Sequence, residues 1–182
     1  VHGMTPAEPL HLLELGLFKY TIEGFCVALG YSPISKSYPK IIQDLDNWAR
    51  QIGRYPGHQS DRGLPRTYFP NAISGGTKLA GHEMNGVLLV LLIMCKLESS
   101  KALLLTKMTE YQLRGWVQLL EMLLAWRWWL KRPTLPMAEV HAAKPCVKYL
   151  MNLFKRVVNR QHGAGLILIK FHICLHFFEN LL

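Results

Sequence analysis

Apolar residues recur at intervals of three and four along most of this chain, and no segment sustains the two-residue alternation of a half-buried strand. The pattern predicts helices over about residues 5–29, 39–53, 77–97, 109–131 and 137–160. Thr5 with Glu8, and Thr109 with Gln112, have the spacing of a capping box and indicate where two of these helices begin. Pro145 is expected to kink or restart the last helix. The fold class predicted is therefore all-α.

Two irregular stretches interrupt the helical pattern. Residues 54–76 are rich in Pro, Gly, Asn and Ser, and a loop of this length in a compact domain is usually functional or a tether. Ser99 and Ser100 are expected to interrupt the helical structure between two longer helices. Residues 1–182 are otherwise expected to form a single helical domain or a fragment of a larger protein. A fragment is considered because the sequence opens without an initiator Met or a leader and stops without a helix stop signal.

The charge of the chain is strongly basic and unevenly distributed. Lys and Arg number 21 against 12 Asp and Glu, which gives a formal net charge of +9. Residues 1–91 hold 8 basic and 7 acidic residues, whereas residues 92–182 hold 13 and 5, so the second half carries a net +8. Such an excess favours an anionic partner, and DNA is the partner predicted here. The cations expected to form its contact face are Arg127, Lys131, Arg132, Lys148, Lys155, Arg156 and Arg160.

The cysteines and the apolar runs indicate where such a protein resides. Cys26, Cys95, Cys146 and Cys174 are far apart and lie among apolar neighbours, so they are predicted to be buried thiols of a reducing compartment. The longest apolar run covers residues 87–95, well short of the roughly 20 residues that a spanning helix needs. We therefore expect a buried helix rather than a membrane anchor, and a protein that is not secreted.

Histidines suggest a metal site. His172 and His176 are one helical turn apart, and Glu8 and His11 also share a helix face, so the four side chains have the chemistry of a structural zinc site. A small zinc-dependent hydrolase built on the same residues is a second interpretation. The third is that the spacing is incidental, with Glu8 only closing its capping box. The chain has no phosphate-binding loop, dinucleotide fingerprint or nucleophile elbow.

Several short motifs, taken in order, resemble proteins encoded by transposons of the CACTA and Plavaka kind. These are the run from His2 to His11, the Gly16-Leu17-Phe18-Lys19-Tyr20 segment, Phe69-Pro70 followed by Gly75-Gly76-Thr77-Lys78, and Lys170-Phe171-His172 followed by His176. The resemblance implies a parent with a DDE/D transposase core of the RNase H kind, which would use two Mg²⁺ ions to cut and join DNA. It also implies a nuclear protein, with cytoplasmic residence as the alternative.

The resemblance assigns roles to individual residues. Glu8 takes the acidic position and His11 the histidine position of an acidic-x-x-His unit near the second catalytic carboxylate, and His172 and His176 match a late histidine pair. Glu83 is a further candidate for a catalytic acid. Glu8 departs from the Asp of those families, and the first catalytic Asp would lie upstream of Val1. The chain is therefore expected to be the helical insertion or C-terminal part of the transposase, and to be inactive as an enzyme by itself.

A different class of function remains open at this stage. Tryptophan is concentrated between residues 116 and 129, and these rings suit a helical interaction module with no role in nucleic-acid binding. In that interpretation a protein partner, or a missing domain of the same parent protein, covers Trp116, Trp126, Trp128 and Trp129.

Overall fold

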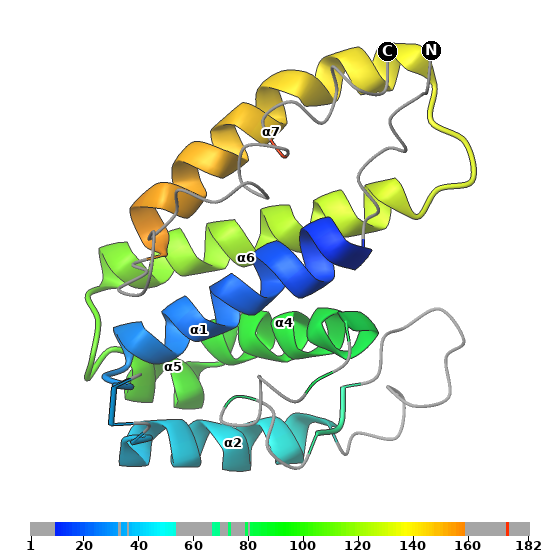
Figure 1. Ribbon diagram of the computed structural model, residues 1–182. Coiled ribbons are helices and arrows are strands. Elements are labelled where there is room, and N and C mark those ends of the chain that lie inside the picture. Colours follow the sequence, from blue (N-terminus) through cyan, green and yellow to red (C-terminus); the bar gives the residue numbers. More distant parts are fainter. Residues whose placement is uncertain are drawn as a thin grey trace.

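Helices are the only regular elements in the computed structural model, which describes residues 10–32, 34–35, 37–53, 67–69, 73, 79, 81–158 and 174. The prediction of an all-α protein is confirmed, and within these ranges the sole extended pairing is an isolated bridge between Ser32 and Ser37. Figure 1 shows the helices as a stack that begins with α2 on one side and ends with α7 on the other. The elements in chain order are η1 (Leu10–Phe18), α1 (Lys19–Ala28), α2 (Lys40–Gly53), α4 (Gly81–Lys96), α5 (Glu98–Leu104), α6 (Glu110–Leu130) and α7 (Met137–Val157).

The first helix has two parts. Its described residues begin as a π-helix, η1, and continue without a break into α1 (Figure 1). Gly30 ends the helix with a φ of 96°, a conformation that glycine adopts without steric cost. The Gly30 and Tyr31 amides donate to the carbonyls of Val27 and Cys26, which is the hydrogen-bond pattern of a Schellman cap. The predicted start at Thr5 and Glu8 lies outside the described residues.

Helix α4 is the centre of the core. It packs against η1, α2, α5 and α6, so a single helix is covered from several sides (Figure 1). Its sequence is apolar almost all round, as expected for a helix enclosed by others, and among its side chains whose burial is described only Lys96 is exposed. The side chains of this helix that are at most 2% exposed are Met84, Val87, Leu88, Val90, Leu91, Met94 and Cys95.

A short helix occupies the predicted break after α4. Helix α5 contains both Ser99 and Ser100, so the expectation of an irregular stretch there is wrong. The Ser100 hydroxyl is fully buried and donates to the Met94 carbonyl at 2.6 Å, which satisfies a backbone acceptor at the end of α4. A serine that would be expected to interrupt a helix therefore joins two helices tightly.

Helices α6 and α7 form an antiparallel pair joined by residues 131–136, and α7 is the last element of the stack (Figure 1). The predicted capping box is confirmed: Thr109 Oγ1 accepts from the Gln112 amide at 3.2 Å, and the Thr109 amide donates to Gln112 Oε1 at 2.8 Å. Helix α7 continues through Pro145 without a restart and ends at Val157. No helix in the described ranges is both long enough and apolar enough to cross a membrane.

Candidate nucleic-acid interface

Arg127, one of the predicted DNA contacts, is held inside the protein. Its Nε donates to Glu14 Oε1 at 2.6 Å, and its Nη2 lies 2.6 Å from the same oxygen. The Glu14 side chain is only 3% exposed and that of Arg127 16%, so a DNA phosphate cannot replace the carboxylate without leaving it buried and unpaired. Arg127 is therefore engaged by Glu14 and is left out of the candidate contact face. Its role is to tie α6 to η1.

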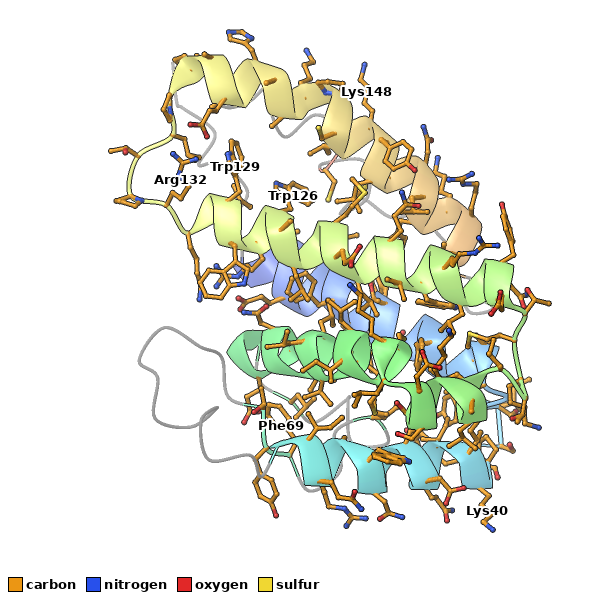
Figure 2. All side chains as sticks on the ribbon, turned by 180° about the vertical axis from the view of Figure 1, so that it is seen from behind. Lys40, Phe69, Trp126, Trp129, Arg132 and Lys148 are labelled. Carbon is orange, nitrogen blue, oxygen red and sulfur yellow. The ribbon has the colours of Figure 1, made fainter. Side chains whose placement is uncertain are left out.

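The cations at the connection between α6 and α7 are also engaged. Both terminal nitrogens of Arg132 contact the Glu139 carboxylate, and the bond from Nη2 to Oε1 is 3.2 Å long. The hydrogen bond from Arg132 lowers the pKa of Glu139. Lys131 Nζ lies 5.3 Å from the centre of the Trp128 ring, within the range of a cation–π contact. Figure 2 shows Arg132 beside this connection.

The C-terminal half of α7 keeps its cations exposed. Lys148, Lys155 and Arg156 are exposed, and Figure 2 shows Lys148 on the outer side of α7, away from α6. After Glu139 the helix contains no carboxylate, so no acidic residue on α7 itself neutralises this end. Arg160 lies outside the described residues. Three of the predicted contacts are therefore solvent-exposed on one helix.

A groove between the N-terminal half of α6 and the C-terminal half of α7 adds cations that the sequence analysis missed. Its volume is about 770 Å³. Lys107 and Arg114 line it together with Arg156, and none of the described lining residues is acidic. Its other lining residues are Ala28, Met108, Tyr111, Gln112, Gly115, Trp116, Gln118, Tyr149, Leu153 and Val157.

The two walls of this groove are held close together. A Cβ on Gly115 would lie 3.1 Å from Val157 Cγ2, so the glycine allows α6 and α7 to approach. Across the groove, Gln118 Nε2 donates to the Tyr149 hydroxyl at 2.9 Å. Below, the Trp116 ring meets the Phe25 ring edge-on, with centroids 5.1 Å apart, and so connects the groove to the core. The groove therefore places the exposed side chains of Arg114 and Arg156 near the exposed rings of Tyr111 and Tyr149, above the buried Trp116.

Most of the residues predicted to bind metal or to act in catalysis fall where the structure gives no description. Glu8, His172 and His176 lie outside the described residues, and the His11 side chain is not among those described. Glu83 is half-buried in the first turn of α4. Across the described part of the chain, no three His, Cys, Asp or Glu side chains gather closely enough to hold a metal ion. Structural zinc and the zinc-dependent hydrolase remain predictions.

Three of the four cysteines are buried as predicted. Burial raises the pKa of the Cys26, Cys95 and Cys174 thiols to about 12, which leaves them protonated and unreactive near neutral pH. Cys146 is exposed, so its predicted burial is wrong. It lies on α7, whose buried face is formed by residues such as Val147 and Leu150, and its own position falls outside that face.

The tryptophans divide between core and surface. Trp116 is 2% exposed and Trp126 is 7% exposed, so neither ring is free to meet a partner. Trp129 is partly buried, and Figure 2 shows both Trp126 and Trp129 projecting from α6 toward the side of α7. Among these four tryptophans only Trp128 is exposed, at 44%. The proposed tryptophan face of an interaction module is thereby reduced to one ring.

Comparisons of the chain with protein family models, with curated proteins and with solved structures found no match. The class of protein is therefore defined by its own features: an all-α stack in which α7, the last helix of the described part, carries a basic outer face and one wall of a cationic groove.

Proposed function

We propose that this chain is the helical part of a transposase-like mobile-element protein and that it binds the DNA backbone without sequence preference through α7. The observation that carries the DNA-binding proposal is the exposure of Lys148, Lys155 and Arg156 on a helix half without a carboxylate. Phosphate contacts by lysine and arginine give affinity without reading base sequence. The engaged cations Arg127 and Arg132 have no part in the proposed interface.

The dimensions of this face suit a phosphate backbone. Lys148 and Lys155 are seven positions apart, so they share one face of α7 and are separated by roughly 10 Å along the helix. Duplex DNA carries one charge per roughly 1.7 Å of its axis, so several phosphates lie within reach of these two lysines and Arg156. Three phosphate contacts predict that the logarithm of the binding constant falls with the logarithm of salt concentration with a slope of about −3.

The transposase relationship is supported by the ordered motifs and by the all-α fold, which suits a helical insertion. The motif residues Glu8, His172 and His176 lie outside the described part of the chain. The proposal for this chain is therefore binding and not cleavage. Mg²⁺, strand transfer and residence in the nucleus belong to the proposed parent protein.

The test compares two exposed lysines that lie far apart in the stack. Figure 2 shows Lys148 on α7 and Lys40 at the beginning of α2, on opposite sides of the molecule. The Lys148→Ala and Lys40→Ala variants lose the same charge, so a general effect of net charge is the same for both. Titration of duplex DNA over a range of salt concentrations should show weaker binding and a slope smaller by about 1 for Lys148→Ala alone.

The DNA-binding proposal would be contradicted if the unsubstituted chain did not bind DNA at low salt, or if the two variants lost the same affinity. Circular dichroism of both variants serves as the folding control. Since the two side chains are exposed, neither substitution removes buried contacts.

A further inference from the structure

We infer that the groove between α6 and α7 binds single-stranded DNA, with bases stacked on Tyr111 and Tyr149 and phosphates placed at Arg114 and Arg156. This inference rests on the proposed function and narrows its ligand from any DNA backbone to an unpaired strand. Lys148 and Lys155 do not line the groove, and Arg156 is the one cation that the groove shares with the outer face.

Exposed aromatic rings are the first observation. Tyr111 is 74% exposed and Tyr149 is 46% exposed, and both line the groove. The Tyr149 hydroxyl accepts a hydrogen bond from Gln118 on α6, which restricts the ring at the boundary of the two helices. A ring that is held in place and open to solvent is the platform on which proteins stack bases, whatever the base.

Charge is the second observation. Lys107, Arg114 and Arg156 line the same groove, and no ion pair or hydrogen bond in the described structure engages their side chains. Arginine beside an aromatic ring can hold a phosphate while a base occupies the ring face. The cations of the groove therefore complement a ligand that presents phosphates and aromatic rings together.

Size and access separate a single strand from a duplex. The groove volume of about 770 Å³ lies within the 300–1,000 Å³ of typical small-ligand sites, so it can admit unstacked nucleotides. In a duplex the base faces are stacked on one another, and rings on a groove wall reach them only after an energetic cost of unstacking. Unpaired DNA presents its base faces directly.

The experiment measures the binding of labelled oligo(dT) and of a duplex of equal length to the full chain by fluorescence anisotropy. Tyr111→Ala should weaken oligo(dT) binding about 5- to 150-fold, the effect of losing one stacked base, and should leave duplex binding nearly unchanged. Tyr111→Phe should bind oligo(dT) as tightly as the unsubstituted chain because the ring face is kept. Arg114→Ala should also weaken oligo(dT) binding.

The matched control is Trp128→Ala, which removes another exposed aromatic ring at the far end of α6. The Trp128→Ala variant should bind oligo(dT) as tightly as the unsubstituted chain. Equal losses for Trp128→Ala and Tyr111→Ala, or losses of the same size for single strand and duplex in Tyr111→Ala, would overturn the inference. Because the Tyr111 side chain is mostly solvent-exposed, its removal should leave the circular dichroism spectrum unchanged.

The two proposals fail in distinguishable ways. If duplex binding depends on Lys148 but oligo(dT) binding is indifferent to Tyr111, the outer face is supported and the groove is rejected. If oligo(dT) binding depends on Tyr111 and duplex DNA does not bind, the groove is supported and the outer face of α7 is rejected. Binding of neither DNA rejects both.

Discussion

The two ends of the α6–α7 pair use the same kind of residue for opposite purposes. At the joined end, beside residues 131–136, Arg127 is paired with Glu14 and Arg132 with Glu139. At the groove end, Lys107, Arg114 and Arg156 surround a groove whose described lining residues include no carboxylate. The comparison shows that a count of cations along a helix does not measure the charge that is available to a ligand. What decides it is whether a carboxylate from another element reaches each cation.

The two ends also differ in what holds them together. Side-chain charge connects the joined end, in part through a buried pair between α6 and η1. The groove end is held by uncharged contacts: the Thr109–Gln112 capping box, the hydrogen bond from Gln118 to Tyr149, and the close approach of helices at Gly24 and Gly115. Lys107, Arg114 and Arg156 at the groove end therefore take no part in holding the described helices together. This difference also predicts that substitutions at the two ends have different consequences.

The largest effect on stability is expected at the buried pair. Arg127→Met leaves the Glu14 carboxylate buried without its partner, and we expect a loss of about 3–5 kcal/mol in the free energy of unfolding. Chemical denaturation of the variant measures this loss. The double variant Glu14→Gln/Arg127→Met should recover much of it, because the uncompensated charge is removed. A loss no greater than that of Arg132→Met would contradict the contrast between the two ends.

The next effect is expected where α1 meets the end of α7. A Cβ at Gly24 would lie 2.6 Å from Val158 Cγ1, and Val158 is buried, so it has little room to move. Gly24→Ala should destabilise the protein by about 1–3 kcal/mol through overpacking. The better helix propensity of alanine should offset up to about 1 kcal/mol of this loss. Thermal or chemical denaturation tests this. Adding Val158→Ala to the Gly24→Ala variant should relieve the contact. A Gly24→Ala variant more stable than the unsubstituted chain would contradict the close approach.

A smaller effect is expected at the capping box that starts α6. Thr109→Ala removes the hydroxyl that accepts from the Gln112 amide, and we expect a loss of about 1 kcal/mol in the free energy of unfolding. Thr106→Ala is the matched control, since its exposed hydroxyl only donates to the Leu103 carbonyl in the preceding turn. If both variants lose the same stability, the capping box has no special role at the groove end.

The smallest effect is expected at the exposed pair of the joined end. The hydrogen bond from Arg132 lowers the pKa of Glu139 below its ordinary value of 4.5, so Arg132→Met should raise the pKa of Glu139 toward that value. A lowered pKa means that the contribution of the pair to stability is present above about pH 4.5 and is lost as the pH falls through the folded-state pKa. NMR titration of the Glu139 carboxyl measures the shift. An unchanged pKa in the variant would show that the pair is not formed in solution.

Local sequence signals were sufficient for most of the helices and insufficient for the site. The periodicity and the Thr109–Gln112 box predicted α6 correctly because a capping box is formed by residues three positions apart. Ser99 and Ser100 misled because the Ser100 hydroxyl finds a carbonyl of the preceding helix, a contact that packing creates. Cys146 misled because its apolar neighbours in sequence say little about which side of α7 faces the core.

The groove shows the same limit more clearly. Lys107 and Arg114 stand out only weakly in the sequence, and their significance depends on the α7 residues Tyr149 and Arg156 that fold against them. A signal was nevertheless present: a lysine, a tyrosine and an arginine lie within eight positions at the start of a helix, in a half of the chain with few acids. What could not be anticipated is that α7 would complete the opposite wall.

The sequence by itself determined that this protein is helical, where α2 and α6 begin and end to within a few residues, and that its second half is basic, because these properties depend on neighbours within one or two helical turns. Only the tertiary structure decided which charges are free. Glu14 is 113 positions away from Arg127, yet the packing of η1 against the helices of the core brings the two side chains into contact. The same packing closes one end of the α6–α7 pair with carboxylates and leaves the other end cationic, because long-range contacts are set by helix packing and not by local sequence.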